Sequence, residues 1–291
     1  MTFLLQIIVN GIANGAIYAI IAVGYSITFT TMRVLNFALG MWVMLGGMLT
    51  YTFYVMLGWP LLVTLVGVLV SMAILGIAAE RATIYPFVKA NSEAWVMSTL
   101  AVGLLFVDSA QLIWGRNAHA VPSYVGDKAI RFAGIGIFPQ NLFIIVSTII
   151  VFLVLEQFYY RSLWGSAFRA VAQNPETASL MGINARLVAV GSYALTSALA
   201  GFAGWIVVPI TLAQPQMGTV LGLKAFVVPI IAGLAAPRGI LLCSFGYGIL
   251  EGAISGYLFS GLRDIVGFSL MILILWFKPE GLFGKPSEER A

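Results

Sequence analysis

Long apolar runs separated by short polar segments occupy most of this chain. The first run extends from Phe3 to Phe29, which is long enough to cross the hydrocarbon core of a bilayer as a helix. Of the 291 residues, 60% are hydrophobic and 9% are charged, a composition that excludes an ordinary soluble domain. The sequence therefore predicts an all-α protein, a polytopic transmembrane helical bundle that forms a single domain over residues 1–291.

Later runs predict further membrane spans at 37–58, 60–79, 94–114, 139–160, 187–210, 240–259 and 264–277. The segment from Leu223 to Ala236 is ambiguous, because its 14 residues are few for a full crossing and Pro229 interrupts it. It either crosses the membrane or re-enters from one side. The predicted number of spans is therefore about eight to nine.

The chain holds few side chains that could carry covalent chemistry. His119 is the only histidine and Cys243 the only cysteine, and the two are far apart in the sequence. No catalytic triad, zinc site or haem site can be assembled from them. We therefore expect a protein that is not an enzyme, with no catalytic or metal-binding residues and no cofactor bound by the chain itself.

Polar and small residues share one face of the first span. Asn10, Asn14 and Tyr18 recur at every fourth position, and Gly11 and Gly15 follow one residue later. Small side chains permit close helix approach, and polar ones need partners or water, so neither is useful on a lipid-facing surface. Two interpretations stay open, helix packing and the lining of a polar path. Glycines expected at packing contacts are Gly11, Gly15, Gly201, Gly248, Gly252 and Gly256.

Two carboxylates fall within predicted spans. Glu251 precedes Gly252 and must be protonated, paired or hydrated if it is buried. It serves either a structural or a functional role. Asp108 lies toward the end of its span, where it is either hydrated near the membrane surface or in contact with a partner or substrate.

A long polar interruption between spans, from Trp164 to Ile183, carries signals of two short helices. Asn174 can accept a hydrogen bond from a free backbone N–H, Pro175 suits the first helical position, and Glu176 complements the positive end of the helix dipole. Gly182 supplies a stop, and a preceding helix is predicted over 165–173. The pair is either an ordinary structured loop or a docking surface.

The distribution of Lys and Arg predicts the orientation. With the N-terminus outside, ten of the fifteen basic residues face the cytoplasm, and the C-terminus is also cytoplasmic. The segment at about 161–187 and the tail at about 278–291 are then cytoplasmic, and the loop at about 115–139 is extracytoplasmic. Predicted cytoplasmic basic residues are Arg33, Arg81, Lys89, Arg161, Arg169, Arg186, Arg238, Lys278, Lys285 and Arg290.

Several short motifs in order resemble one known family over nearly the whole chain. They are Asn10-Gly11 with Gly15 to Ala19, Asn36-Phe37-Ala38, Glu80-Arg81 with Pro86, Ala178 to Asn184, Lys224-Ala225-Phe226, Glu251, and Phe277 to Gly284. The chain is similar to the permease subunits of branched-chain amino acid ABC importers, a family that also includes urea and amide permeases. Leu39 and Met41 depart from the family pattern, which usually has a histidine and an acidic residue there.

The resemblance implies an inner-membrane permease subunit that works by alternating access. Its implied partners are two cytoplasmic ATPases that bind ATP and Mg, a second permease subunit and an extracytoplasmic solute-binding protein, with the lipid bilayer around it and no nucleic acid. The residues implied in ATPase coupling are Phe168, Arg169, Asn174, Pro175, Glu176, Ala178, Ser179, Met181 and Gly182. The candidates for the substrate path are Asn10, Asn14, Tyr18, Asn36, Phe37 and Glu251. The first four are favoured because amide and phenol groups can pair with a zwitterion without a buried fixed charge.

Other functions stay open at this point. An autonomous channel or a proton-coupled secondary carrier would use Asp108 and Glu251 as titrating groups, with urea, amides, aromatic compounds or carboxylates as possible substrates. A membrane scaffold would show no flux with any partner. The exact substrate and the identity of the second permease subunit do not follow from the sequence.

Overall fold

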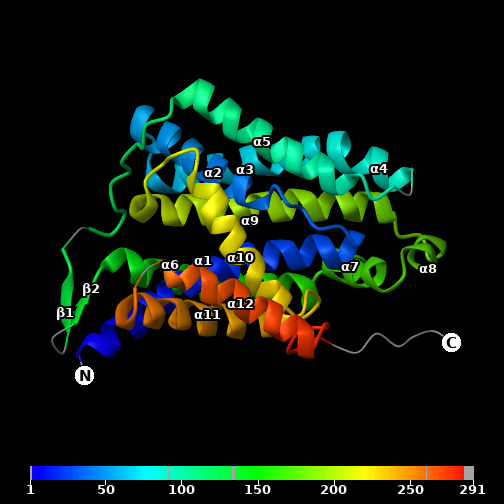
Figure 1. The fold of residues 1–291 in the computed structure, drawn as a ribbon. Coiled ribbons are helices and arrows are strands. Elements are labelled where there is room, and N and C mark those ends of the chain that lie inside the picture. The colour runs from blue at the N-terminus through cyan, green and yellow to red at the C-terminus, as the bar shows by residue number, and fades with distance from the viewer. Residues whose placement is uncertain (1, 91, 127, 133–134, 260, 285–291) are drawn as a thin grey trace. The chain divides into compact units, whose positions relative to one another are not determined.

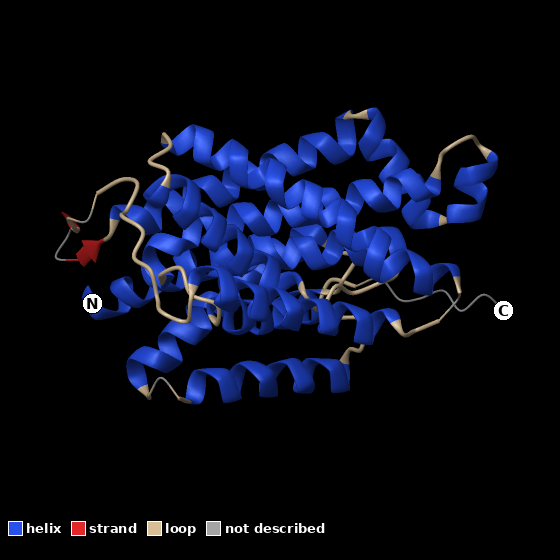
Figure 2. Cartoon of the chain, turned by 90° about the horizontal axis from the view of Figure 1, so that it is seen from above, coloured by secondary structure: helices blue, strands red, loops and turns tan. Residues whose placement is uncertain are grey.

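The computed structural model describes residues 2–90, 92–126, 128–132, 135–259 and 261–284 (Figure 1). Lys285 and Arg290, and with them the predicted tail beyond Gly284, lie outside the described residues. The described chain is helical apart from its loops and one antiparallel hairpin, in which Ile130 pairs with Ile137 (Figure 2). The helices are α1 (Thr2–Met32), α2 (Leu39–Thr50), the π-helix η1 (Tyr51–Met56), α3 (Leu61–Ala79), the π-helix η2 (Glu80–Ile84), α4 (Tyr85–Lys89), α5 (Trp95–Trp114), α6 (Pro139–Arg161), α7 (Leu163–Gln173), α8 (Pro175–Leu180), α9 (Ala185–Thr211), α10 (Met217–Ala232), α11 (Pro237–Tyr257) and α12 (Leu262–Phe277), and the strands are β1 (Ile130–Phe132) and β2 (Ile135–Ile137).

Within the described residues, seven helices are long and apolar enough to cross a membrane. The prediction of an all-α polytopic bundle is confirmed. The candidate spans are Phe3–Met32, Leu39–Met56, Leu61–Val88, Trp95–Trp114, Pro139–Arg161, Ala185–Thr211 and Pro237–Tyr257. Helices α10 and α12 have 16 residues each, about 24 Å at 1.5 Å per residue, which is shorter than the ~30 Å hydrocarbon core.

Two predicted boundaries are wrong, and the first is the end of the third span. The sequence predicts that this span ends at Ala79 and that Glu80, Arg81, Lys89 and Glu93 form a charged loop after it. Instead the helix continues from α3 through η2 into α4, as far as Lys89. Pro86 lies in the first turn of α4 and has no N–H to donate to the preceding turn, and the wider π turn comes just before it. Glu80 is consequently a helical residue.

Helix α10 also differs from its prediction. It begins at Met217, six residues before the expected Leu223, and ends at Ala232 with Pro229 inside it. Gly218 and Gly222 in the added turns face Gly40 of α2, and an ideal Cβ on Gly222 would lie 2.6 Å from the Gly40 Cα. The start of α10 is therefore set by close packing of glycines, which hydropathy does not report.

The chain forms two compact units. Unit 1 comprises Met1–Ser26, Ser123–Thr148 and Leu223–Ala291, and unit 2 comprises Ile27–Pro122 and Ile149–Gly222. Three of the four boundaries fall inside α1, α6 and α10, so each of these helices belongs partly to both units, and the fourth falls in the loop at Pro122. The single domain predicted from the sequence stays a prediction.

Unit 1 is built on a close contact between α1 and α11. An ideal Cβ on Gly11 would lie 2.7 Å from the Cα of Ile249, and one on Gly15 would lie 2.8 Å from the Cα of Phe245. Real Cβ atoms do not approach backbone so closely, so these glycines let the two helix backbones touch. Gly248 meets Gly11 and Gly15 from the other side of the same contact, while Gly252 and Gly256 face Ile7.

Unit 2 is organised around α9, which packs against α2 and α3. The small residues again mark the contact. An ideal Cβ on Gly46 of α2 would lie 2.6 Å from the Cα of Gly201, and Gly204 faces the backbone of Gly46 and Gly47. Trp42 and Met44 of α2 are fully buried beside this contact, so the core of unit 2 lies along α2 and α9.

Candidate functional site: a buried charged cluster and a capped helix pair

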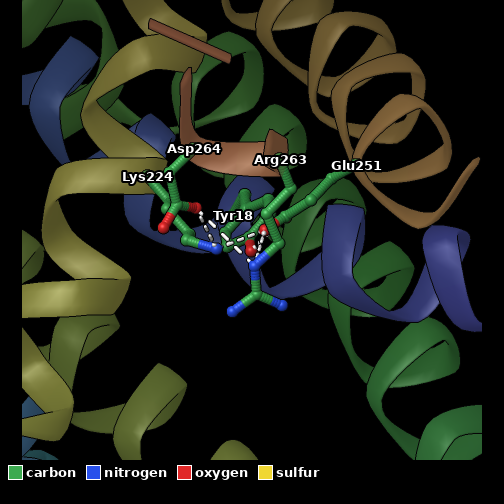
Figure 3. Close-up of polar contacts among 5 residues, drawn as sticks. All are labelled: Tyr18, Lys224, Glu251, Arg263 and Asp264. Atoms are coloured by element: carbon green, nitrogen blue, oxygen red, sulfur yellow. Dashed lines mark hydrogen bonds and ion pairs between the residues drawn. The ribbon is translucent and has the colours of Figure 1, made fainter. Parts of the chain in front are cut away.

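Five ionisable side chains from four helices of unit 1 meet in one cluster, which we call the charged cluster: Tyr18 of α1, Lys224 of α10, Glu251 of α11, and Arg263 and Asp264 of α12 (Figure 3). Glu251 belongs to the glycine-rich part of α11, three residues after Gly248 and next to Gly252. The close approach of α1 to α11 brings the Tyr18 hydroxyl within reach of the Glu251 carboxylate. The first turn of α12 supplies the remaining two charges.

Glu251 is the centre of this network. Its Oε2 accepts a hydrogen bond of 2.6 Å from the Tyr18 hydroxyl, and its Oε1 is paired with the Lys224 ammonium. The Arg263 Nε lies 3.5 Å from the same Oε1. Lys224 also contacts Asp264 Oδ1 at 2.9 Å, and Arg263 Nε lies 3.6 Å from that oxygen. Each carboxylate therefore has two cationic neighbours.

The cluster is buried at one end and open at the other. The side chains of Lys224 and Glu251 are 6% and 4% exposed, whereas those of Arg263 and Asp264 are 39% and 49% exposed. Two acids face two bases, so the formal charges cancel, which is a requirement for ions held among apolar helices. In Figure 3 the terminal nitrogens of Arg263 point away from the carboxylates. A planar guanidinium with free donors can bind a carboxylate with two hydrogen bonds.

The structure separates the three predicted polar residues of the first span. Tyr18 is buried in the charged cluster, while Asn10 is partly buried and its Oδ1 accepts a hydrogen bond of 3.3 Å from Asn141 of α6. Asn14 is exposed on the surface of the chain. Of these three, only Asn14 has its side chain at the surface, and whether it lines a substrate path stays a prediction.

Asn36 and Phe37, the other candidates for the path, lie in unit 2 just before α2. The Asn36 side chain is 2% exposed, and its Oδ1 accepts a hydrogen bond of 3.0 Å from the backbone N–H of Ala38. This is a local turn in which asparagine satisfies backbone at the entry to a helix. The structure thus places Asn36 in a turn, with its side-chain oxygen already used, and leaves Phe37 half-buried.

The local structure predicted between Trp164 and Ile183 is confirmed. Asn174 Oδ1 accepts hydrogen bonds of 3.0 Å from the backbone N–H groups of Glu176 and Thr177, Pro175 occupies the first turn of α8, and Gly182 has φ +84°. Helix α7 has its own cap, Ser162, whose hydroxyl accepts from the Gly165 N–H at 2.8 Å. We call α7, Asn174 and α8 the helix pair.

The helix pair has an anchored face and an exposed face. Phe168 and Ala178 are buried, and the Phe168 ring packs edge-on against those of Phe158 and Tyr159. Leu180 and Met181, by contrast, are 87% and 81% exposed at the end of α8. Exposed apolar side chains held on a capped, anchored helix are typical of a protein-binding surface. Arg169 is half-buried and its guanidinium lies over the Tyr160 ring, while Pro175, Glu176 and Ser179 are exposed.

Other residues considered from the sequence are placed apart from both features. Asp108 is exposed on α5, and the His119 ring stacks on Tyr51 with its Nε2 2.9 Å from the Trp114 carbonyl oxygen. Across the described part of the chain, no group of three or more His, Cys, Asp or Glu residues is placed to hold a metal ion. Sequence reasoning did not assign Lys224, Arg263 or Asp264 to a site. The available signal was one lysine in a short apolar segment of a chain that also held a glutamate within a span.

Comparison with known proteins gives one consistent result. A family model described as "Branched-chain amino acid transport system / permease component" matches residues 7–275. The high-affinity branched-chain amino acid transport system permease protein LivH of Escherichia coli K12 is 28% identical over 302 aligned positions, covering 99% of this chain and 98% of LivH. The corresponding BraD protein of Pseudomonas aeruginosa is 26% identical, covering 98% and 97%, and the probable LivH of Methanocaldococcus jannaschii is 27% identical, covering 96% and 92%. No solved structure matches this chain at a significant level.

The family model matches from near the start of α1 to near the end of α12, and LivH aligns over nearly its whole length. It follows that the chain is a multi-pass membrane protein and a transport subunit. The chain belongs to the family of permease components of branched-chain amino acid transport systems.

Proposed function

We propose that this chain is the membrane subunit of an ATP-driven importer for branched-chain or related amino acids. The observation that carries the proposal is the end-to-end similarity to proteins named as branched-chain amino acid permeases, over 99% of this chain. The chain would work with two ATPases that bind ATP and Mg, a second permease subunit and an extracytoplasmic solute-binding protein. It would carry out no covalent chemistry itself.

The helix pair supports the link to the ATPases. Alternating access requires that a movement of the ATPases be transmitted to the spans, and a rigid lever with an exposed apolar end suits that task. Capping at Asn174 and burial of Phe168 make the pair rigid, while exposed Leu180 and Met181 offer contact area to a partner. The pair would therefore be the element that docks on an ATPase.

The proposed orientation puts the N-terminus outside and the C-terminus in the cytoplasm of the bacterial inner membrane. It rests on the excess of Lys and Arg in the segments assigned to the cytoplasm. Seven long helices, or nine with α10 and α12 counted as crossings, both give an odd number of crossings and opposite ends. Under this orientation the helix pair faces the ATPases.

The charged cluster supports a contact with a zwitterionic substrate. Its open end presents the Arg263 guanidinium and the Asp264 carboxylate, one group for each charge of an amino acid. Glu251 lies beside Arg263 and Lys224 beside Asp264, so these two buried residues would hold the exposed pair in place. The wider substrate path, including Asn14, stays part of this proposal.

Co-purification from native membranes in mild detergent tests the proposal. The intact chain is compared with a double variant, Arg169→Glu with Glu176→Arg, and with Arg116→Glu as a matched control at an exposed site away from the helix pair. We expect an ATPase pair to accompany the intact chain and the control and to be lost from the double variant. If no ATPase accompanies the intact chain in several detergents, the importer proposal fails.

A proton-coupled carrier is the second candidate, and the charged cluster is the observation that favours it. Ionisable groups held among membrane helices are a common feature of proton pathways. The two carboxylates invoked for it differ, because Glu251 is paired with Lys224 while Asp108 is exposed in the other unit. Amino-acid uptake by vesicles that contain this chain but no ATPase would favour the carrier.

A further inference from the structure

Unit 2 contains a cavity of about 410 Å³ behind the helix pair. Four segments line it: the end of α1, the stretch from η2 into α4, the join of α7 and α8, and the start of α9. Its volume lies within the range of ~300–1,000 Å³ that small-molecule sites occupy. The charged cluster belongs to unit 1, so this cavity is a separate feature.

The cavity wall holds one buried carboxylate without a full set of partners. Glu80 is 1% exposed, and its Oε2 accepts no hydrogen bond from any residue that the structure describes. Arg186 and Arg81 are close enough to act on its charge, and Arg186 lines the cavity whereas Arg81 does not. A carboxylate oxygen buried without a donor is costly, so a ligand that brings a donor would be favoured here.

A guanidinium is held in place on the same wall. The Arg186 Cζ lies 4.0 Å from the centre of the Tyr85 ring, and both residues line the cavity. Stacking on an aromatic ring orients the planar guanidinium and leaves its N–H groups free to bind a carboxylate. Arg33, a second cation on the wall, follows α1 with φ +56°, and its Cζ lies 5.5 Å from the centre of the Phe29 ring.

The rest of the wall is mainly apolar, and includes Met32, Val88, Val171 and Ala189. One carboxylate (Glu80), two guanidinium groups (Arg186 and Arg33) and an apolar wall offer partners for the three parts of an aliphatic amino acid, namely its ammonium, its carboxylate and its side chain. Glu80 would repel the negative charge of an anionic lipid. A single carboxylate supplies too few oxygen ligands for a divalent cation. The chemistry therefore favours a small zwitterion with an aliphatic side chain.

We infer that this cavity is a second binding site for an aliphatic amino acid, separate from the transport path, with Glu80 holding the ammonium and Arg186 the carboxylate. Under the proposed orientation the cavity faces the cytoplasm. The effect of a bound amino acid on transport therefore rests on the proposed function. A ligand here contacts Val171 of α7 and Pro175 of α8 on one side and α9 and η2 on the other. It would tie the helix pair to the spans and oppose its movement, so accumulated product would slow ATP hydrolysis.

Binding of L-leucine to the purified complex, without the solute-binding protein, tests the inference by calorimetry. The variants are Glu80→Gln and Arg186→Gln, with Arg161→Gln as the control, because Arg161 is an exposed cation near the helix pair that does not line the cavity. We expect each cavity variant to weaken binding about tenfold to a hundredfold, since each loses a hydrogen bond to a charged group. The control should bind as the unaltered complex does.

A third cavity variant leaves the buried Glu80 unaltered, so it separates loss of binding from misfolding caused by a change at Glu80. Ala189→Leu adds side-chain volume from α9 into the cavity and keeps every charge. It should abolish the leucine binding and relieve the slowing of ATP hydrolysis at high leucine. Unchanged leucine affinity in Glu80→Gln, Arg186→Gln and Ala189→Leu would overturn the inference. If the complete, unaltered system took up no leucine although the purified complex bound leucine in the cavity, the proposed function would fail and this inference would stand.

Discussion

Removal of the Lys224 charge is the most informative perturbation of the charged cluster. In Lys224→Met a flexible apolar chain replaces the ammonium, and Glu251 keeps only the Tyr18 hydroxyl and the more distant Arg263 Nε. Breaking a buried ion pair from one side costs about 3–5 kcal/mol. The two partners that remain on Glu251 place the expected loss at about 3 kcal/mol, the lower end of that range.

The double variant Lys224→Met with Glu251→Leu separates the pair from its surroundings. Replacing both ions by apolar residues removes the uncompensated charge, and the largest remaining cost is the Tyr18 hydroxyl left without its acceptor, about 1–3 kcal/mol. The two single variants together should therefore cost about 2–3 kcal/mol more than the double variant. Arg263→Gln should cost less than about 1 kcal/mol, because its side chain is 39% exposed and solvent screens it.

The measurement is reversible unfolding of the purified chain in mixed micelles with increasing denaturing detergent, followed by circular dichroism. The midpoint and slope give the free energy of unfolding for each variant. Additive costs in the double-mutant cycle, or a loss below about 1 kcal/mol for Lys224→Met, would refute the view that this pair is buried and mutually compensated.

Three further predictions concern packing and local structure. Gly15→Leu should prevent stable folding, since a Cβ there would already lie 2.5 Å from the Ser244 carbonyl oxygen. The yield of monodisperse protein in detergent measures folding, and Gly246→Leu is the control because a Cβ at Gly246 meets no atom within 4 Å. Asn174→Ala should cost about 1 kcal/mol of unfolding free energy, because α8 loses its cap, and faster amide exchange confined to α8 would reveal it. Gly182→Ala should also destabilise by about 1 kcal/mol, because its φ of +84° disfavours a side chain; equal protease resistance around residue 182 in both proteins would contradict this.

The spans were predictable to within a few residues because hydropathy over about twenty residues is a local property. The predicted spans at 94–114 and 139–160 correspond to α5 and α6 with a residue of difference at one end. The failures come where a local rule competes with packing. Glu80 and Arg81 read as loop residues by charge, yet helical hydrogen bonding continues past them into α4.

The candidate sites divide in the same way. Asn174, Pro175 and Gly182 act through neighbouring backbone, so their roles in the helix pair could be derived from residue type and spacing. Asn36 shows the limit of such reasoning, because its amide could equally have faced a path and instead accepts the Ala38 N–H. Spacing alone does not distinguish these two uses.

The sequence by itself determined the class of protein, the positions of most spans and the capped helix pair, since each depends on residues close together in the chain. Only the tertiary structure decided that Lys224 meets Glu251, that Tyr18 and α12 complete the charged cluster, and that Glu80 and Arg186 share a cavity. Glycines at Gly11, Gly15 and Gly248 let α1 and α11 touch, and that contact positions the cluster. Residues separated by whole helices come together through packing geometry, which hydropathy and local propensity do not encode.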